Sequence, residues 1–271
     1  MSFDFTRQSP HPTLPRHNTI LHLLENRGSM TIAELTEALK VSEQTIRRDL
    51  KKLEEMNCLT RFHGGANSLQ PPKNQNESLV VNKGIDTREF LCVPEKEAIA
   101  QKVADLIPDG STVFITIGTT VEKIAKVLNE RRKDLFVITD SLRVASLIYR
   151  PGTNKVLVPS GLISSPNGGI SSLQSISDLK HFRPDFTITS LGAIEKDGTM
   201  LDFNISEVEA AKVMMKNAKQ IVIACDHTKF TATASVTLGD LRDADYLVSD
   251  IDPDENLRRV LEEGHVQFIK A

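Results

Sequence analysis

Residues 41–54 read VSEQTIRRDLKKLE, and this stretch decides the fold of the N-terminal part of the chain. Ser42 is a favourable N-cap residue, and the apolar residues after it recur at spacings of four and three: Ile46, Leu50 and Leu53. This pattern predicts an amphipathic helix that runs from Ser42 to about Met56. At about 100° per residue, the side away from the apolar stripe and its edge carry mostly basic residues: Gln44, Arg47, Arg48, Lys51, Lys52 and Glu55.

A second helical pattern lies immediately before this one. It begins after Met30, with Thr31 as the expected N-cap and Glu34 completing a capping box. Another helical pattern precedes it and stops at Gly28, where glycine allows a left-handed cap. A helix, a short turn and a second helix with a basic outward face form a helix-turn-helix, whose second helix enters the major groove of DNA.

The basic helix and the segment after it predict several kinds of DNA contact. Gln44 suits adenine, and Arg47 or Arg48 suits guanine, whereas the lysines of the helix suit phosphates. Residues 57–66, NCLTRFHGGA, predict a β wing close to the sugar-phosphate backbone. A solvated face on an ordinary surface helix is the alternative for the basic residues, and the wing favours DNA. The expected DNA-binding residues are Ser42, Gln44, Thr45, Arg47, Arg48, Lys51, Lys52, Arg61 and His63.

Residues 16–66 resemble the winged helix-turn-helix of the DeoR family of bacterial sugar-metabolism repressors, most specifically in VSEQTIRRDLKKLE and TRFHGGA. The resemblance continues to about Asp250. The subgroup to which the chain is most similar includes glycerol-3-phosphate regulon repressors and regulators of sulfoquinovose catabolism, with IPDGSTVFITIGTT and LGAIEKDGTMLDF as shared runs. It implies an α/β protein: an N-terminal winged helix-turn-helix and a C-terminal Rossmann-like effector domain resembling ribose-5-phosphate isomerase and CoA transferase.

The composition is that of an ordinary globular protein, with 271 residues, 39% hydrophobic, 25% charged and a net charge of −3. Residues 1–66 hold nine Lys and Arg against eight Asp and Glu, so the placement of the basic residues matters more than their sum. No stretch reaches about 18 uninterrupted apolar residues and no signal-peptide core is present, so we expect a cytoplasmic protein. The three cysteines have no C-x-x-C spacing and predict neither a disulfide framework nor a zinc site.

The chain divides at a segment without helical or strand periodicity. Residues 67–94 contain paired prolines and several asparagines, which is typical of a linker. After them, apolar runs alternate with amphipathic helical patterns, which predicts a parallel sheet covered by helices. We therefore expect a flexible N-terminus at 1–15, a DNA-binding domain at 16–68, a linker at 69–93 and an effector-sensing α/β domain at 94–271.

Polar turns follow several of the predicted strands. Residues 111–117 lead into Gly118-Thr119-Thr120, residues 135–139 into Asp140-Ser141, and residues 155–158 into Pro159-Ser160-Gly161. Free N–H groups and a helix dipole at such turns suit a phosphate or sulfonate, and neighbouring strand ends converge at one edge of an open α/β sheet. Lys229, after the strand at 220–225, supplies a cation if it faces the same edge. The alternatives are a simple helix cap at Gly118-Thr119-Thr120 and a surface lysine at 229.

The family resemblance implies that Gly118, Thr119, Thr120, Ser141, Asp226 and Lys229 line an effector site, with Glu207 near it. Glu207 is otherwise a glutamate favoured at a helix N-terminus. The chain departs from the family pattern at Thr116, Asp140, Ser160-Gly161 and Ser172, which leaves the identity of the ligand open. The effector-binding residues that we expect are Gly118, Thr119, Thr120, Asp140, Ser141, Gly161, Glu207, Asp226 and Lys229.

The leading hypothesis is a DNA-binding repressor of a carbohydrate catabolic operon, regulated by a phosphorylated or sulfonated sugar or polyol. One recognition helix makes few contacts, so we expect a homo-oligomer, a dimer or tetramer, on double-stranded operator DNA. Whether the effector induces or corepresses stays open. The alternative is a sugar-phosphate isomerase-like enzyme with Asp140, Glu207, Asp226 and Lys229 as acid-base candidates, against which the DNA-reading module argues. We expect no cofactor, metal or membrane partner.

Overall fold

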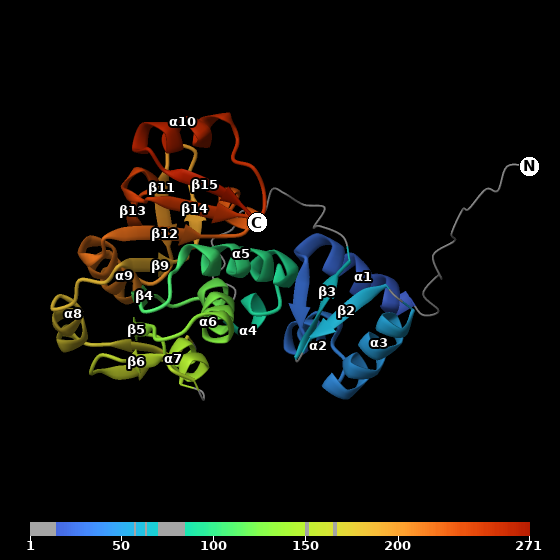
Figure 1. Cartoon of the computed structure of the whole chain (residues 1–271). Helices are drawn as coiled ribbons and strands as arrows, with labels where there is room; N and C mark the ends of the chain where they lie inside the picture. Colours follow the sequence, from blue (N-terminus) through green and yellow to red (C-terminus); the bar gives the residue numbers. More distant parts are fainter. Residues whose placement is uncertain (1–14, 57, 63, 70–84, 150–151, 165–166) are drawn as a thin grey trace, which may run out of the picture. The chain divides into compact units, whose positions relative to one another are not determined.

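The computed structural model describes residues 15–56, 58–62, 64–69, 85–149, 152–164 and 167–271. The chain forms two compact units, Met1–Glu77 and Ser78–Ala271 (Figure 1). Within the part of the chain that is described, no helix combines the length and the apolar character that crossing a membrane requires. Each unit is described by itself below.

The first unit is a winged helix-turn-helix. A three-stranded antiparallel sheet in the order β1-β3-β2 packs with three helices. The elements are α1 (Pro15–Arg27), β1 (Ser29–Thr31), α2 (Ile32–Leu39), α3 (Glu43–Glu55), β2 (Leu59–Phe62) and β3 (Gly65–Ser68). The predicted caps are confirmed: Thr31 and Glu34 form a capping box on α2, and Ser42 accepts a hydrogen bond from the Thr45 N–H at the start of α3.

The apolar stripe of α3 reaches the core of this unit, as its spacing predicts. Ile46, Leu50 and Leu53 are buried among apolar residues of the other helices and the sheet. The wing turns back at Gly64-Gly65, and a Cβ at Gly65 would lie 2.3 Å from the Phe62 ring and 2.4 Å from the Met30 carbonyl oxygen. Only glycine lets the two strands approach so closely here.

The second unit is built on a seven-stranded parallel sheet in the order β15-β14-β12-β9-β4-β5-β6. Its first half contains α4 (Ile85–Arg88), α5 (Val93–Leu106), β4 (Thr112–Ile115), α6 (Thr119–Arg131), β5 (Phe136–Thr139), α7 (Leu142–Ile148), β6 (Lys155–Leu157), β7 (Leu162–Ser164), β8 (Gly169–Ser171) and α8 (Leu173–Leu179). The rest contains β9 (Phe186–Thr189), β10 (Ala193–Ile194), β11 (Thr199–Asp202), α9 (Ile205–Asn217), β12 (Gln220–Ala224), η1 (His227–Phe230), β13 (Val236–Asp240), η2 (Leu241–Asp243), β14 (Tyr246–Ser249), α10 (Glu255–Gly264) and β15 (Gln267–Lys270).

Helices cover both faces of this sheet, as the alternation of strand and helix patterns predicts (Figure 1). Val113 and Ile115 of β4 pack with α5, α6 and α7 on one face, whereas Phe114 between them packs with α8 and α9 on the other. An antiparallel sheet, β10-β11-β13, and the hairpin β7-β8 are additions that the sequence patterns did not indicate.

Residues 85–93, which the sequence analysis places in the linker, contain α4 and the first residue of α5. Ile85 is fully buried. The linker residues 70–84 and the N-terminal residues 1–14 lie outside the described part of the chain.

Candidate functional site

The basic side of α3 is exposed over its whole length: Gln44, Arg47, Arg48, Lys51 and Lys52. Arg47 lies 3.5 Å from Glu43 and Lys51 lies 3.9 Å from Glu55, one helical turn apart in each case. Within the described residues, Arg48 and Lys52 have neither an ion pair nor a side-chain hydrogen bond. The helix therefore presents two unpaired cations and two weakly paired ones. A row of exposed cations on one side of a helix suits contacts with DNA phosphates and guanine.

The inner side of α3 carries a buried acid that sequence analysis missed. Asp49 is 3% exposed and accepts hydrogen bonds from Arg16 at 2.6 and 3.1 Å. The Nε2 atom of His17 lies 3.2 Å from the same carboxylate. Burial alone would raise the pKa of Asp49, but the bonds from Arg16 and His17 outweigh it and lower that pKa. Asp49 thereby links the recognition helix to α1 through side-chain hydrogen bonds.

Arg61 connects the wing to the recognition helix. Its backbone N–H and its Nε donate to Glu54 at 3.0 and 2.7 Å, respectively. Thr45 lies in the first turn of α3, and its hydroxyl is 2.9 Å from that of Ser42. His63, the other wing residue expected at DNA, lies outside the described residues.

In the second unit, the carboxyl ends of four adjacent strands, β12, β9, β4 and β5, lie at one edge of the sheet. The hydroxyls of Thr116 after β4 and Thr189 at the end of β9 are 2.9 Å apart, which joins two of these ends. Several predicted effector-binding residues gather at this edge and at the start of α9. We call them the strand-end site: Gly118, Thr119, Thr120, Asp140, Glu207, Asp226 and Lys229.

The N-terminus of α6 has no capping side chain. Its N-cap is Gly118, with φ of 146°, a backbone conformation that favours glycine. Thr119 and Thr120 follow and are buried, with 6% and 2% of their surface exposed. The first N–H groups of the helix and the positive end of its dipole are therefore available to an oxyanion, the group that helix N-termini bind best.

Two carboxyl groups form the acidic side of the site. Asp140 is 2% exposed, and its Oδ1 has no hydrogen-bond partner among the described residues. Burial raises its pKa to about 7, and the charge of Glu207 contributes to the rise. Glu207, in the first turn of α9, accepts hydrogen bonds from Asn167 at 2.8 Å and Asn204 at 3.1 Å, and burial raises its pKa as well. A ligand hydroxyl would satisfy the unpartnered oxygen of Asp140.

Asp226 and Lys229 lie together after β12. The Asp226 carboxylate accepts hydrogen bonds from the Thr228 N–H, at 3.1 Å, and from the Thr228 hydroxyl. Burial would raise the pKa of Asp226, but the positive charge of Lys229, the Thr228 bonds and a second lysine, Lys96, lower it. Asp226 is therefore ionised at neutral pH.

Lys96 is a residue of this site that sequence analysis missed. It lies in the first turn of α5, is 3% exposed, and its Nζ donates to the Thr119 hydroxyl at 3.1 Å and to the Arg88 carbonyl at 2.6 Å. The signal was in the sequence: Lys96 precedes Ile99 by three residues and Ala100 by four, so it falls on the apolar stripe of its own helix.

Arg88, at the end of α4, is a second residue that was missed. Its Nε is buried and has no hydrogen-bond partner in the described part of the chain. Burial raises the pKa values of Asp202 and Glu207, and the positive charge of Arg88 partly opposes that rise. No spacing rule marks Arg88, because it lies in a segment that reads as linker.

Two predicted effector-binding residues have local structural roles. Ser141 is fully buried and caps α7 by accepting a hydrogen bond from the Val144 N–H at 3.2 Å. At Gly161, a Cβ would lie 3.0 Å from Ile170 and from the Ser171 carbonyl oxygen, both in β8. Contact of Ser141 or Gly161 with a ligand stays a prediction.

A possible set of metal ligands lies beside the site. Cys92, Asp226 and His227 bring one ligand atom each to within 4.8 Å of one another. Burial raises the pKa of the Cys92 thiol to about 12, with Asp226 adding to the rise, and the Nδ1 of His227 lies 2.6 Å from Asp250.

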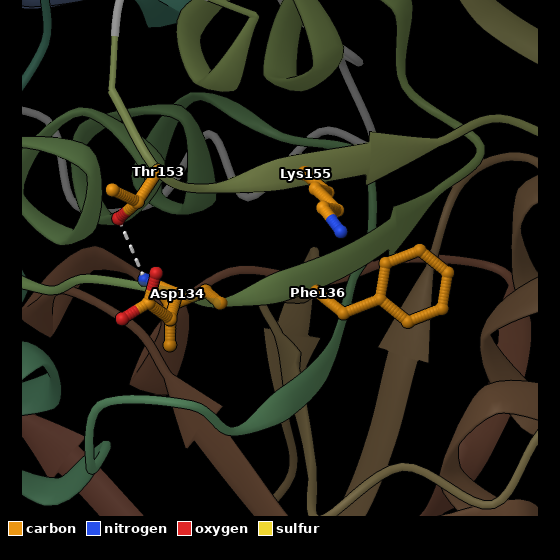
Figure 2. Close-up of a pocket in the computed structure, with 5 residues that line it drawn as sticks. Asp134, Phe136, Thr153 and Lys155 are labelled. Carbon is orange, nitrogen blue, oxygen red and sulfur yellow. Dashed lines mark hydrogen bonds between the residues drawn. The ribbon is translucent and has the colours of Figure 1, made fainter.

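A separate hollow lies at the opposite, amino ends of β5 and β6 (Figure 2). Its volume is about 460 Å³, and it is lined by Asp134, Leu135, Phe136, Thr153 and Lys155. The Asp134 N–H donates to the Thr153 hydroxyl at 2.9 Å across its rim (Figure 2). None of the residues expected to bind an effector lines this hollow.

Both units match known domain families. Residues 16–71 match the DeoR-like helix-turn-helix domain, and residues 92–251 match the DeoR C terminal sensor domain. The chain belongs to the DeoR family. As a DeoR-family protein it is a DNA-binding transcriptional regulator, which confirms the leading hypothesis at this level.

Full-length relatives of this DeoR-family chain carry names of regulators. The HTH-type transcriptional repressor CsqR of Escherichia coli (strain K12) is 43% identical over 255 residues, which cover 94% of each chain. The glycerol-3-phosphate regulon repressor of the same strain is 35% identical and covers 93% of this chain and 97% of its own. These names support a regulator over the isomerase-like alternative.

Solved structures match part of this chain only at low similarity. Ribose 5-phosphate isomerase A from Neisseria gonorrhoeae superposes with a TM-score of 0.36 and 14% sequence identity, over 51% of this chain and 53% of its own. A resemblance this distant says nothing about function.

Proposed function

We propose that this DeoR-family protein represses a carbohydrate catabolic operon and that a phosphorylated or sulfonated sugar or polyol, bound at the strand-end site, changes its affinity for operator DNA. Names of relatives support the first part, since they include repressors of glycerol-3-phosphate and lactose phosphotransferase regulons. The geometry of the strand-end site supports the second part.

The observation that carries the proposal is the polarity of the strand-end site. One side offers the uncapped N-terminus of α6 and the cation of Lys229, which suit an oxyanion. The other side offers Asp140, with an unpartnered buried oxygen, and Glu207. A molecule with an anionic end and hydroxyl groups, such as a sugar or polyol phosphate, satisfies both sides at once.

We further propose that the protein acts as a homo-oligomer, a dimer or a tetramer. A single recognition helix covers one half-site, and two helices held one turn of DNA apart roughly double the contacts. For the effector to act, it must bind the DNA-competent and DNA-incompetent states with different affinity, by about 1–3 kcal/mol in typical cases.

The experiment compares how an effector changes the operator affinity of wild-type protein, Lys229→Ala and Thr119→Ala. A charge-assisted hydrogen bond contributes about 1.5–3 kcal/mol, so Lys229→Ala should weaken an anionic effector by about ten- to a hundredfold, and Thr119→Ala by less. Both variants should bind operator normally without effector. Operator occupancy is measured by fluorescence anisotropy while sugar and polyol phosphates are titrated.

The matched control is Lys196→Ala, because Lys196 is exposed in the turn between β10 and β11. It should respond to the same ligands as the wild type does. Response curves of Lys229→Ala and Thr119→Ala that coincide with the control would remove the strand-end site from the proposal.

A further inference from the structure

The hairpin β7-β8 exposes apolar side chains on its outer strand. Leu162 and Ile163 of β7 are 79% and 59% exposed, and Ser164 is exposed as well. Because successive residues of a strand point to opposite faces, both faces of β7 present an apolar side chain to solvent. A two-stranded hairpin is marginally stable at best in water by itself, so an apolar strand in this position gains stability from a partner.

The sequence around this hairpin contains no charged residue. From Val158 to Ser177 the chain reads VPSGLISSPNGGISSLQSIS, twenty residues without Asp, Glu, Lys, Arg or His, whereas 25% of the whole chain is charged. Leu173, the first residue of α8, lies in this run and is 91% exposed. An exposed surface that combines apolar side chains with a lack of charge is typical of the central part of a protein–protein interface.

The two edges of the main sheet show what β7 lacks. The edge strands β6 and β15 carry the exposed lysines Lys155 and Lys270. Lysine on an edge strand discourages pairing with another chain, since pairing would bury its charge. β7 has no charged residue, and among the described residues its only strand partner is β8. Its outer edge is therefore open to pairing.

The hydrogen bonds of β8 show which backbone groups of β7 face outward. Ile163 is opposite Ile170 in the hairpin, and the Ile170 N–H donates away from β7, to the Asp140 carbonyl at 2.7 Å. Opposite residues of an antiparallel ladder alternate between hydrogen-bonded and non-hydrogen-bonded pairs, so Ile163 and Ile170 form a non-hydrogen-bonded pair. The N–H and C=O of Ile163 therefore point to the outer edge of β7, where a further strand can bind them.

We propose that β7 pairs antiparallel with β7 of a second copy of this chain, around a two-fold axis at Ile163. This inference rests on the proposed homo-oligomer and names the surface through which it forms. Each Ile163 N–H donates to the carbonyl of the partner's Ile163, and the two hairpins join into one sheet. Leu162 and Ile163 lose exposed apolar surface on pairing, which stabilises the contact.

Two observations favour a second copy over a different protein. A strand that pairs antiparallel around a two-fold axis is its own complement, so the open edge of β7 needs no second kind of surface. The uncharged run from Val158 to Ser177 also offers no charge that would select a partner of opposite sign.

The first test measures the mass of the full-length protein by sedimentation equilibrium over a range of concentrations. Leu162→Lys places like charges in the paired surface and should raise the dissociation constant about a hundredfold or more. Ile163→Pro removes the N–H that donates to the partner and should also dissociate the pair, while proline is tolerated on an edge strand. Both residues are exposed in a single copy, so the circular dichroism of the variants should match that of the wild type.

The matched control is Ile251→Lys. Ile251 is an exposed apolar residue after β14, and three strands separate β14 from β5, the strand that precedes the bond between Asp140 and the hairpin. This variant should have the same mass as the wild type at every concentration.

A cysteine cross-link tests the register of the pair. The Cα atoms of a hydrogen-bonded antiparallel pair lie about 5.5 Å apart, which is within the range of a disulfide. Ile163→Cys should therefore form a covalent dimer when diamide is added as the oxidant. Leu162→Cys should not, because residue 162 lies opposite the partner's Ser164 and not opposite its own counterpart. Wild-type protein, with its three native cysteines, gives the background.

The outcomes separate this inference from the proposed function. If wild-type protein is a monomer at every concentration, the homo-oligomer and this surface both fail. If the wild type is an oligomer and Leu162→Lys and Ile163→Pro keep its mass, only the assignment of the surface fails. If both variants dissociate but Ile163→Cys cross-links no more than Leu162→Cys, the two-fold axis at Ile163 is wrong. None of these measurements uses an effector, so they leave the proposed effector site untouched.

Discussion

The recognition helix and the strand-end site carry their charges in opposite ways. On α3, Arg48 and Lys52 are exposed and, among the described residues, unpaired. At the strand-end site, Lys96 is 3% exposed and Asp140 is 2% exposed. Exposed charges cost little free energy, so an ordinary surface helix could carry the same ones. Buried charges destabilise the fold unless something compensates them, so their presence points to a ligand more strongly.

This contrast shows which observation supports each function. The evidence that α3 binds DNA comes from its context, namely the helix-turn-helix, the wing and the family match. The evidence that the sensor domain binds a ligand comes from the free-energy cost of burying individual polar groups without a partner, such as the Oδ1 of Asp140. Substitutions should therefore affect the two sites differently: stability and pH dependence at the strand-end site, affinity and salt dependence on α3.

The largest effect is expected at Asp140. Its pKa is raised to about 7, so between pH about 4 and 7 the unfolded chain loses a proton that the folded protein keeps. The free energy of unfolding should therefore fall as pH rises through this window, by about 1.4 kcal/mol per unit and about 4 kcal/mol in all. Asp140→Asn should remove the decline and be more stable than the wild type at pH 8.

Urea unfolding of the sensor domain at pH 5 and pH 8 measures this effect. Asp243→Asn, at an exposed position in η2, is the control and should retain the wild-type pH dependence. Parallel profiles for Asp140→Asn and the wild type would show that burial does not hold Asp140 protonated.

A smaller change in stability, in this case a loss, is expected from Asp49→Ala in the DNA-binding unit. The change leaves Arg16 and His17 without their shared carboxylate and should cost about 2–3 kcal/mol. Because the pKa of Asp49 is lowered, its contribution is present above pH about 4 and is lost as the pH falls through the lowered pKa. Calorimetry should show a lower melting temperature for this unit and an unchanged sensor transition. Glu55→Ala, at an exposed position of α3, should melt like the wild type.

The difference between Asp49 and the other residues of α3 shows how far sequence patterns reach. Helical periodicity placed Ile46, Leu50 and Leu53 inside and the basic residues outside, because both follow from the 3.6-residue turn. It gave no role to Asp49, since its partners, Arg16 and His17, lie more than 30 residues away. Local patterns predict which side of a helix faces the core, whereas partners distant in sequence require the tertiary structure.

The strand-end site divides in the same way. The turns after β4, β5 and β12 were predictable, because polar residues that follow an apolar strand meet at one edge of a parallel sheet. Arg88 was not, because α4 is a single helical turn in a segment rich in polar residues. The burial of Lys96 was predictable from the sequence, since a lysine on an apolar stripe breaks the pattern of its own helix.

On the recognition helix, Arg48→Ala should lower specificity as well as affinity. A bidentate contact of arginine with guanine is worth about 1–3 kcal/mol of discrimination against the wrong base. Arg47, which Glu43 partly neutralises at 3.5 Å, is the matched comparison, and Arg47→Ala should reduce base discrimination less than Arg48→Ala does. The measurement is competition between a duplex selected by the wild type from a random pool and its single-base variants. Equal discrimination by wild-type protein and Arg48→Ala would exclude a base contact.

The smallest effect is expected from Lys52→Ala, and it differs in kind from that of Arg48→Ala. Lys52 is exposed one helical turn beyond Arg48, so its flexible ammonium suits a phosphate, which carries no sequence information. Each neutralised phosphate contributes about 0.9 to the slope of log affinity against log salt. Lys52→Ala should therefore weaken selected and unselected duplexes by the same factor and reduce that slope by about one unit, with discrimination unchanged. Anisotropy titrations at several salt concentrations measure both quantities. A loss of discrimination in Lys52→Ala would place this residue at a base edge, and the distinction between reading and anchoring positions along α3 would no longer hold.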